Sequence, residues 1–333
     1  QNETQSNSPF GRIDPYSILL INSLISLFLF TFLIMLSGML FVFLPLLVGY
    51  LVKIGKPVWI DRINKATSHL VLVILGLMGL GLANLDNIGQ NLSQIVVITA
   101  TFFICIGGGN IAALPILDRI WPTPAEDNQT KLPLTKMMGE SAKLILVVAL
   151  GLVIGLFVPL ETALIDKASE AILVVLLLLI GAQLRNSGIS LKQILLNPKG
   201  ISLALLIVGT SLPGGLLAAW LLDLPFTHGL AMASGFGWYS LTGILISEGL
   251  GPVMGGAAFL NELLRELASL IIIPLLISRY PLTSIGYAGA TAMDFTLPII
   301  QSTGGIRCVP IAIVSGFILS LLVPVLILFF ISL

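Results

Sequence analysis

Charged side chains are scarce in this sequence. Asp, Glu, Lys and Arg make up 10% of its 333 residues, whereas 56% are hydrophobic and the mean hydropathy is +1.06. Ordinary soluble domains carry roughly 25% charged residues, so this composition excludes a water-soluble globular domain. It predicts an all-α, polytopic membrane protein, because helices satisfy their own backbone groups in lipid.

An excess of charge of either sign is also missing. The 16 basic residues balance the 16 acidic ones, so nothing indicates a nucleic-acid partner. Cysteine is rare too, because only Cys105 and Cys308 are present, far apart and without a CxxC pattern. We interpret both as small packing residues and expect neither a metal site nor a cofactor.

Enzyme signatures are absent as well. The sequence contains no HExxH, no GxSxG in a strand–turn–helix context and no phosphate-binding loop. An intramembrane enzyme that uses Glu266 and Asp294 as acid and base remains an alternative, although neither residue has a recognisable catalytic partner.

Long apolar runs dominate what is present. Residues 1–17 form a polar tail, and the run 18–52 exceeds the length of one span of about 20 residues. We expect a break at Ser37-Gly38, which leaves an extra N-terminal segment over 18–37 and a transporter domain over 38–332. One long tilted helix is the alternative. The domain holds about ten transmembrane segments, of which the clearest cover 38–53, 68–85, 93–116, 144–159, 168–184, 200–222 and 309–332.

Basic residues concentrate in three connections. These connections hold Lys53–Lys65, Arg119–Lys143 and Arg185–Lys199, whereas the connections between them are poor in Lys and Arg. The positive-inside rule makes all three cytoplasmic and places the protein in the cytoplasmic (inner) membrane. The C-terminus is external if ten spans follow the extra segment.

The ten segments divide into two possible repeats, 38–184 and 200–332. Asp86 follows the second segment of one unit and Glu248 follows the second segment of the other. Units with five spans each would be inverted relative to one another, as in many transporters. A chance match of two carboxylates is the alternative.

Glycine clusters interrupt three apolar stretches. We predict that 229–251 and 286–305 are broken or re-entrant rather than full-length helices. The stretch from Gly107 to Asn110 should be irregular or closely packed. Five residues of the first break could line a pocket, namely Gly235, Gly237, Trp238, Tyr239 and Ser240; anchoring at the membrane interface is the alternative for the two aromatic residues.

A charged cluster lies inside an apolar run that follows the first break. Glu262 and Glu266 fall four residues apart on one helical stripe, with Arg265 and Asn261 beside them. Arg265 can compensate one carboxylate, so a proton, a bound cation or another base must meet the second. The alternative is a buried ion pair between Glu262 and Arg265 with a protonated spare carboxyl group.

Two further carboxylates are candidates. Asp86, flanked by Asn84 and Asn87, could coordinate a cation or an ammonium group, or could act as a turn or cap residue. Asp294, inside the second break, could bind a ligand or could cap a half-helix.

Long motifs at these positions resemble the bacterial lysine exporter family. They include LDN at 85–87, GNIAAL at 109–114, LAMASGFGWYSLTGIL at 230–245, GPVMGGAAFLNELLRELA at 251–268 and GATAMDFTLPIIQSTGG at 289–305. The resemblance covers about residues 38–332. It implies a multi-pass exporter of L-lysine that depends on intramembrane carboxylates, which correspond here to Asp86 and Glu266.

Lysine also suits this chemistry. Carboxylates would bind its ammonium groups, and helix N-termini freed by the breaks would bind its carboxylate. No nucleotide-binding motif is present, so an ion gradient must supply the energy. We therefore expect proton antiport, with another coupling cation or another solute, such as an organic anion or an inorganic cation, as alternatives.

Overall fold

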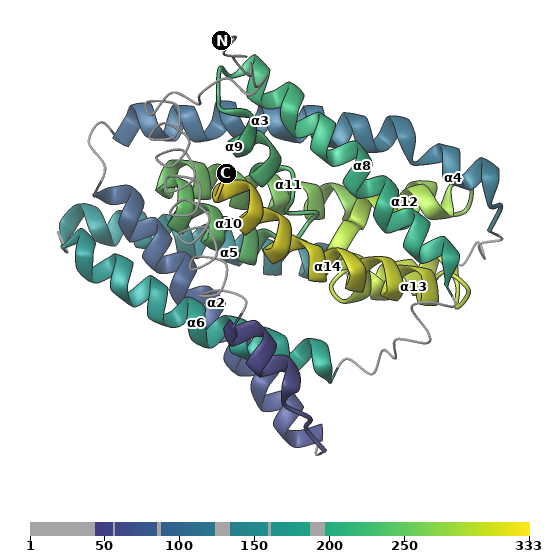
Figure 1. Ribbon diagram of the computed structural model, residues 1–333, viewed down its shortest axis with the longest axis horizontal. Helices are drawn as coiled ribbons and strands as arrows, with labels where there is room; N and C mark the ends of the chain where they lie inside the picture. Colours follow the sequence, from purple (N-terminus) through teal and green to yellow (C-terminus); the bar gives the residue numbers. More distant parts are fainter. Residues whose placement is uncertain (1–43, 56, 85–87, 124–133, 159–160, 187–196) are drawn as a thin grey trace, which may run out of the picture.

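The computed structural model describes residues 44–55, 57–84, 88–123, 134–158, 161–186 and 197–333 (Figure 1). All regular structure in these ranges is helical, which confirms the all-α prediction. The tail, the extra N-terminal segment and Asp86 lie outside the described residues.

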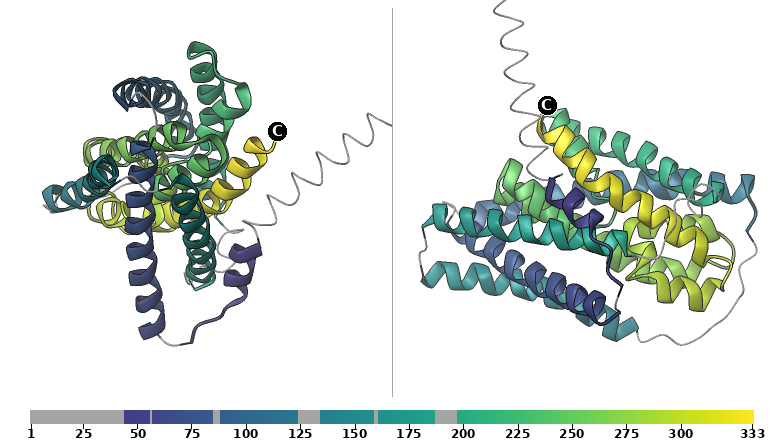
Figure 2. Two further views of the ribbon diagram at one scale, coloured as in Figure 1. Left: turned by 90° about the vertical axis from the view of Figure 1, so that its left-hand side faces the viewer. Right: turned by 60° about the horizontal axis from the view of Figure 1, so that its bottom comes forward.

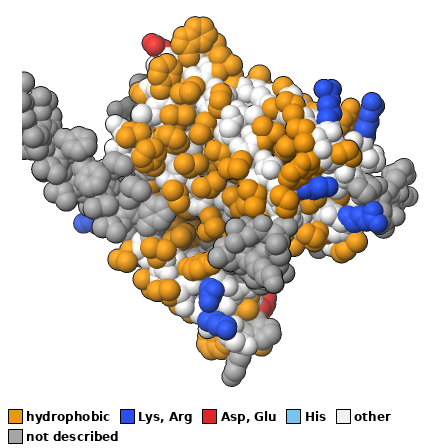
Figure 3. All heavy atoms as spheres, turned by 45° about the vertical axis from the view of Figure 1, so that its right-hand side comes forward, with side chains coloured by type: hydrophobic (Ala, Val, Ile, Leu, Met, Phe, Trp, Pro, Cys, Tyr) orange, Lys and Arg blue, Asp and Glu red, His pale blue; other side chains and the backbone are white. Residues whose placement is uncertain are grey.

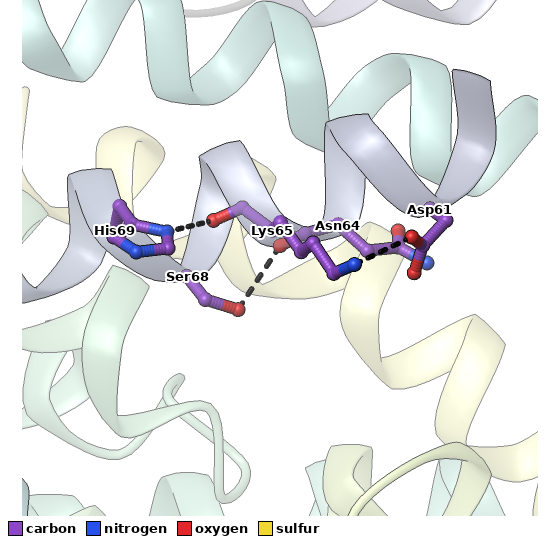
Figure 4. A network of polar contacts seen from close by, with 5 residues as sticks. All are labelled: Asp61, Asn64, Lys65, Ser68 and His69. Carbon is purple, nitrogen blue, oxygen red and sulfur yellow. Dashed lines mark hydrogen bonds and ion pairs between the residues drawn. The ribbon is translucent and has the colours of Figure 1, made fainter. Parts of the chain in front are cut away.

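The first half of the chain contains long helices. After helical residues 44–51, they are α2 (Pro57–Ala83), α3 (Ile88–Ala113), the short α4 (Pro115–Ile120), α5 (Leu134–Phe157) and α6 (Thr162–Arg185). The predicted loop around Lys53–Lys65 is wrong in part, because α2 already begins at Pro57. Arg62 and Lys65 are carried on its first turns, where Lys65 pairs with Asp61 at 2.8 Å (Figure 4).

The second half alternates long and short helices. They are α8 (Pro198–Leu221), α9 (Phe226–Met232), α10 (Tyr239–Leu250), α11 (Pro252–Leu276), α12 (Pro281–Ala288), the 3₁₀ helix η1 (Gly289–Met293), α13 (Leu297–Gly304) and α14 (Val309–Ile331). Proline occupies the first turn of α8, α11, α12, α13 and α14, where its missing N–H costs nothing.

Within the described ranges, four helices are long and apolar enough to cross a membrane by length and composition: 58–83, 89–120, 198–221 and 309–331. α11 is equally long but carries three charged residues. Large apolar side chains are exposed along α2, α3, α5 and α6. Figure 3 shows hydrophobic side chains over most of one face, with basic ones gathered in two groups at its edges. Such a surface fits lipid, as expected for a membrane protein.

The three basic connections lie at one end of the molecule. Ile54 N donates to Asn186 Oδ1 at 2.9 Å, which joins the first connection to the third. Lys199 Nζ donates to Thr123 Oγ1 at 2.9 Å, which joins the third to the second. A shared side of the membrane requires this arrangement, and which side it is stays a prediction. We call this end the basic end and the opposite end the far end.

The segment 226–250 is a hairpin that returns to the far end. α14 runs away from the basic end, where Gly200 and Ile311 are close, and finishes at Ile331. A side chain added at Gly249, at the end of α10, would lie 2.7 Å from Ile331. α10 therefore ends where α9 began, and α11 starts from the same end (Figures 1 and 2).

The segment 281–304 is a second hairpin, which enters from the basic end. Leu282 N, in the first turn of α12, bonds Asp118 near the second basic connection. Gly304, the last residue of α13, packs against Ile277 at the end of α11. α12 and α13 thus share one end of the molecule, opposite α10 (Figures 1 and 2).

Both interruptions predicted at 229–251 and 286–305 are confirmed, and each segment folds back as a hairpin. That the hairpins are re-entrant in the membrane stays a prediction. The irregularity predicted at Gly107–Asn110 is wrong, because α3 continues through it. Its close-packing alternative is confirmed: a side chain at Gly107 would lie 3.2 Å from the Tyr287 hydroxyl. The described helices of the first half show no matching hairpin, so the ten-span count and the inverted repeat stay predictions.

Candidate functional site

The two hairpins contact each other at their tips, which are the residues between their helices: 233–238 in the first hairpin and 289–296 in the second. Ala290 N donates to Phe236 O at 2.8 Å. Gly289 has φ +66° and Gly237 has φ +100°, and a Cβ at Gly289 would overlap the Phe236 carbonyl oxygen. Only glycine combines these backbone angles with so close an approach, which explains the glycines of both breaks.

Glu262 of α11 holds the tip of the first hairpin. Its side chain is 1% exposed, and its carboxylate accepts hydrogen bonds from Gly237 N and, at 2.9 Å, from Asn261 Nδ2. Gly237 lies two residues before α10, so the carboxylate faces the positive end of that helix dipole. Gly235 leaves room for it, since a Cβ there would lie 2.8 Å from Glu262 Oε1.

Arg265, one turn along α11, holds the tip of the second hairpin. Its Nε donates to Tyr287 O at 2.9 Å and its Nη2 donates to Gly286 O at 3.3 Å. These carbonyls belong to the last turn of α12, the negative end of its dipole. The guanidinium also lies 5.8 Å from the centre of the Tyr287 ring, within cation–π range.

The alternative of a direct ion pair between Glu262 and Arg265 is therefore wrong. Among the described residues the sole salt bridge is Lys65–Asp61, and each charge of α11 meets a different broken helix instead. Helix ends carry about half an elementary charge and unsatisfied backbone groups, so they can replace a counter-ion.

Glu266 supplies the second buried carboxyl group of α11. Its side chain is 1% exposed, and its backbone oxygen accepts from Ser269 Oγ at 2.6 Å. Asn84 directly follows the last residue of α2. Because Asp86 lies outside the described residues, its role beside Glu266 in binding an ammonium group stays a prediction.

Asp294 lies beyond the second tip and is exposed. Its Oδ1 accepts from the adjacent Phe295 N at 2.6 Å, whereas α13 begins after Thr296 without a side-chain cap. The half-helix-capping interpretation is therefore wrong, and ligand binding by Asp294 stays a prediction.

The aromatic residues of the first break pack within the protein. Trp238 directly precedes α10 and contacts the main apolar core. The Tyr239 ring packs edge-on against Phe259 of α11, with centroids 6.0 Å apart. Ser240 is buried in the first turn of α10. These positions are next to the hairpin tip, as the pocket interpretation requires.

Asn110 forms a polar contact between α3 and α8. Its Oδ1 accepts from Thr210 Oγ1 at 2.5 Å and from Ser211 Oγ at 3.3 Å. The two hydroxyl residues lie in an apolar run whose sequence gives no sign of this contact.

Asp118 was missed by sequence reasoning. This α4 carboxylate accepts from Leu282 N at 2.8 Å, Thr283 N at 2.9 Å and Thr283 Oγ1 at 2.6 Å, and so caps α12 from another part of the chain. A separation of more than 160 residues leaves no local signal for such a cap.

Two opposed hairpins that meet beside a charged helix are typical of one class of protein, the membrane transporters with discontinuous helices. The family model of the lysine exporter LysO matches residues 145–331. The lysine exporter LysO of Escherichia coli K12 is 50% identical over 297 residues, which are 89% of this chain and 99% of that protein. The chain therefore belongs to the lysine exporter LysO family.

A second relative is a Haemophilus influenzae protein named "Putative lysine exporter". It is 48% identical over 161 residues, which are 48% of this chain and 83% of that protein. No solved structure matches the chain.

Proposed function

We propose that the protein exports L-lysine across the cytoplasmic membrane in exchange for protons. Membership of the lysine exporter family and the names of both relatives support lysine as the cargo. A transporter family also argues against the intramembrane enzyme and against organic anions as the main substrate.

One observation carries the proposed mechanism. α11 places two carboxyl groups and one guanidinium in the protein interior, each at most 4% exposed. Two carboxyl groups and one guanidinium give the cluster one formal negative charge. Glu262 and Arg265 hold helix ends, so we assign the exchange to Glu266, whose carboxyl group can bind either a proton or an ammonium group.

Exchange follows from this competition. In the inward-facing state, the lysine ammonium groups displace the protons bound to Glu266 and Asp86, which are released to the cytoplasm. On the outer side the two carboxylates bind the same number of protons as lysine leaves, and the protonated site returns. We assign Asn84 and Asn261 to the polar lining around these groups, and Asp294 to a more exposed position on the same route.

The exchange is tested in proteoliposomes that contain labelled lysine and an imposed pH gradient. We expect lysine movement to depend on the gradient, and Glu266→Gln and Asp86→Asn to abolish it while the protein remains folded, because an amide cannot carry the charge. Glu161→Gln, an exposed acid before α6, is the matched control and should retain transport.

Two results would overturn parts of this proposal. Transport by Glu266→Gln near the wild-type rate would remove that residue as the carrier. Lysine movement driven by a sodium gradient and insensitive to pH would replace the proton by another cation.

A further inference from the structure

Arg265 is the only basic residue among the buried residues of the described chain, with 4% of its surface exposed. Its Nε and Nη2 reach backbone carbonyls of α12. Its Nη1 is buried and has no hydrogen-bond partner in the described part of the protein. A buried charged donor without an acceptor is costly and rare, so this atom calls for an explanation.

Among the described residues, no carboxylate lies within salt-bridge distance of this guanidinium. Glu262, one turn earlier on α11, bonds Gly237 N and Asn261 Nδ2. A buried guanidinium with a free N–H and no carboxylate partner is complementary to a carboxylate ligand.

We propose that Arg265 Nη1 binds the α-carboxylate of the exported amino acid. This inference rests on the proposed export of L-lysine and specifies how the same site recognises it. The ligand class is an amino acid with a cationic side chain: carboxylates of the site take its ammonium groups, and Arg265 takes its carboxylate.

The geometry disfavours the other candidate for that carboxylate. The N-terminus of α10 is the obvious anion site at the hairpin tips, but Glu262 already faces it. A substrate carboxylate placed there would meet a like charge, so Arg265 replaces the helix N-terminus in the recognition scheme.

Binding requires the two tips to part. Nη1 is inaccessible in this structure, and Gly289 packs over the guanidinium, with its Cβ position 3.1 Å from Nη2. The tips touch each other through the hydrogen bond from Ala290 N to Phe236 O. Separation of the hairpins would expose Nη1 at the point where they meet.

The consequence is selectivity for the amino acid over the diamine. Cadaverine has the same five-carbon diamine chain without the carboxylate, and L-lysinamide replaces the carboxylate by a neutral amide. A charge-assisted hydrogen bond changes affinity by about 10-fold or more, so the wild-type protein should bind lysine at least about 10-fold more tightly than either analogue.

The test is calorimetric binding of the three ligands to the purified full-length protein in chloride-free buffer. In Arg265→Gln, lysine affinity should fall about 10-fold while cadaverine and lysinamide affinities stay within about 3-fold, so the selectivity ratio approaches one. Arg265→Lys keeps the positive charge and should retain part of the selectivity for lysine over the two analogues. Arg279→Gln, at an exposed arginine stacked on Tyr280, is the matched control and should keep the full ratio.

Each other outcome is decisive. Equal binding of the three ligands by the wild-type protein would overturn the role of Arg265 while leaving lysine export intact, even if no Arg265 variant folds. An equal loss of all three ligands in Arg265→Lys and Arg265→Gln would make Arg265 a residue that only positions α12. Failure of the wild-type protein to bind any of them would overturn the proposed function itself.

Discussion

At the scale of single residues, Glu262 and Arg265 show how a membrane interior accommodates charge without an ion pair. Each side chain satisfies backbone groups that a helix break leaves open, the carboxylate at the start of α10 and the guanidinium at the end of α12. Removing either one would uncover buried backbone groups in a region without water.

Glu262 therefore stabilises the first hairpin by accepting hydrogen bonds rather than by forming a salt bridge with Arg265. Glu262→Ala leaves Gly237 N and Asn261 Nδ2 without their acceptor, at about 1–3 kcal/mol for each buried group. Glu262→Gln keeps one acceptor oxygen, so its thermal stability in detergent should lie between Glu262→Ala and wild type. Equal melting temperatures for Glu262→Ala and wild type would refute this role.

Gly289 tests the contact between the tips. Gly289→Ala places a methyl group against the Phe236 carbonyl oxygen and also strains a φ of +66°. Gly251→Ala is a matched control, because Gly251 has φ +89° but nothing within 4 Å of its Cβ position. The control should cost about 1 kcal/mol for the backbone alone.

Gly289→Ala should cost several times more stability than Gly251→Ala and should abolish lysine export, because the tips can no longer meet. The two purified variants are compared by thermal melting and by transport. Similar losses in both would mean that the backbone angle matters and the close approach does not.

At the scale of elements, α12 is an eight-residue helix held by side chains at both ends. Asp118 of α4 caps its N-terminus with three hydrogen bonds, and Arg265 of α11 holds its C-terminal carbonyls. An acid at the positive end and a base at the negative end both match the helix dipole. So short a helix needs such support, because it is unstable alone.

We expect Asp118→Ala to destabilise the protein by about 1–3 kcal/mol, because it removes the cap from two backbone N–H groups. Asp118→Asn keeps one acceptor and should lose less. Asp61→Asn, at an exposed acid of α2, is the control and should stay within about 0.5 kcal/mol of wild type. If Asp118→Ala and the Asp61→Asn control had the same melting temperature, the stabilising role of the Asp118 cap would be contradicted.

The sequence predicted where the second half is interrupted and left open whether each segment is broken or re-entrant. Glycines at 235, 237 and 289 mark the breaks because their backbone angles and close contacts are local properties. The return of each hairpin depends on contacts between distant segments, such as Gly249 with Ile331. The same limit explains why Asp118 was missed and why the alternative of a Glu262–Arg265 ion pair was wrong. Sequence spacing brings the two charges close together, whereas their hydrogen-bond partners come from the hairpin tips.

At the scale of the whole molecule, we expect the hairpins to reduce the number of crossings without changing the side on which the chain ends. A re-entrant hairpin begins and ends on one side, so two of them would remove two spans from the expected ten. We therefore expect the C-terminus on the side opposite the basic end; Figure 1 shows it away from α12 and α13. The cytoplasmic position of the basic end remains a prediction from the positive-inside rule.

Cysteine labelling in cells can separate hairpins from spans. Both native cysteines are first removed by Cys105→Ser and Cys308→Ser. Single cysteines then replace four exposed residues. Asp223 precedes the first hairpin and Glu248 lies in its last turn, whereas Arg279 and Arg307 flank the second hairpin. An impermeant thiol reagent added outside should label the cysteines at 223 and 248. The cysteines at 279 and 307 should be labelled only after the membrane is permeabilised. The pair at 248 and 279 is the internal control, because α11 crosses between them.

If 226–250 spanned the membrane, the cysteines at 223 and 248 would label from opposite sides. The meeting of the two tips, and with it the placement of Glu262 and Arg265 at helix ends, would then be lost.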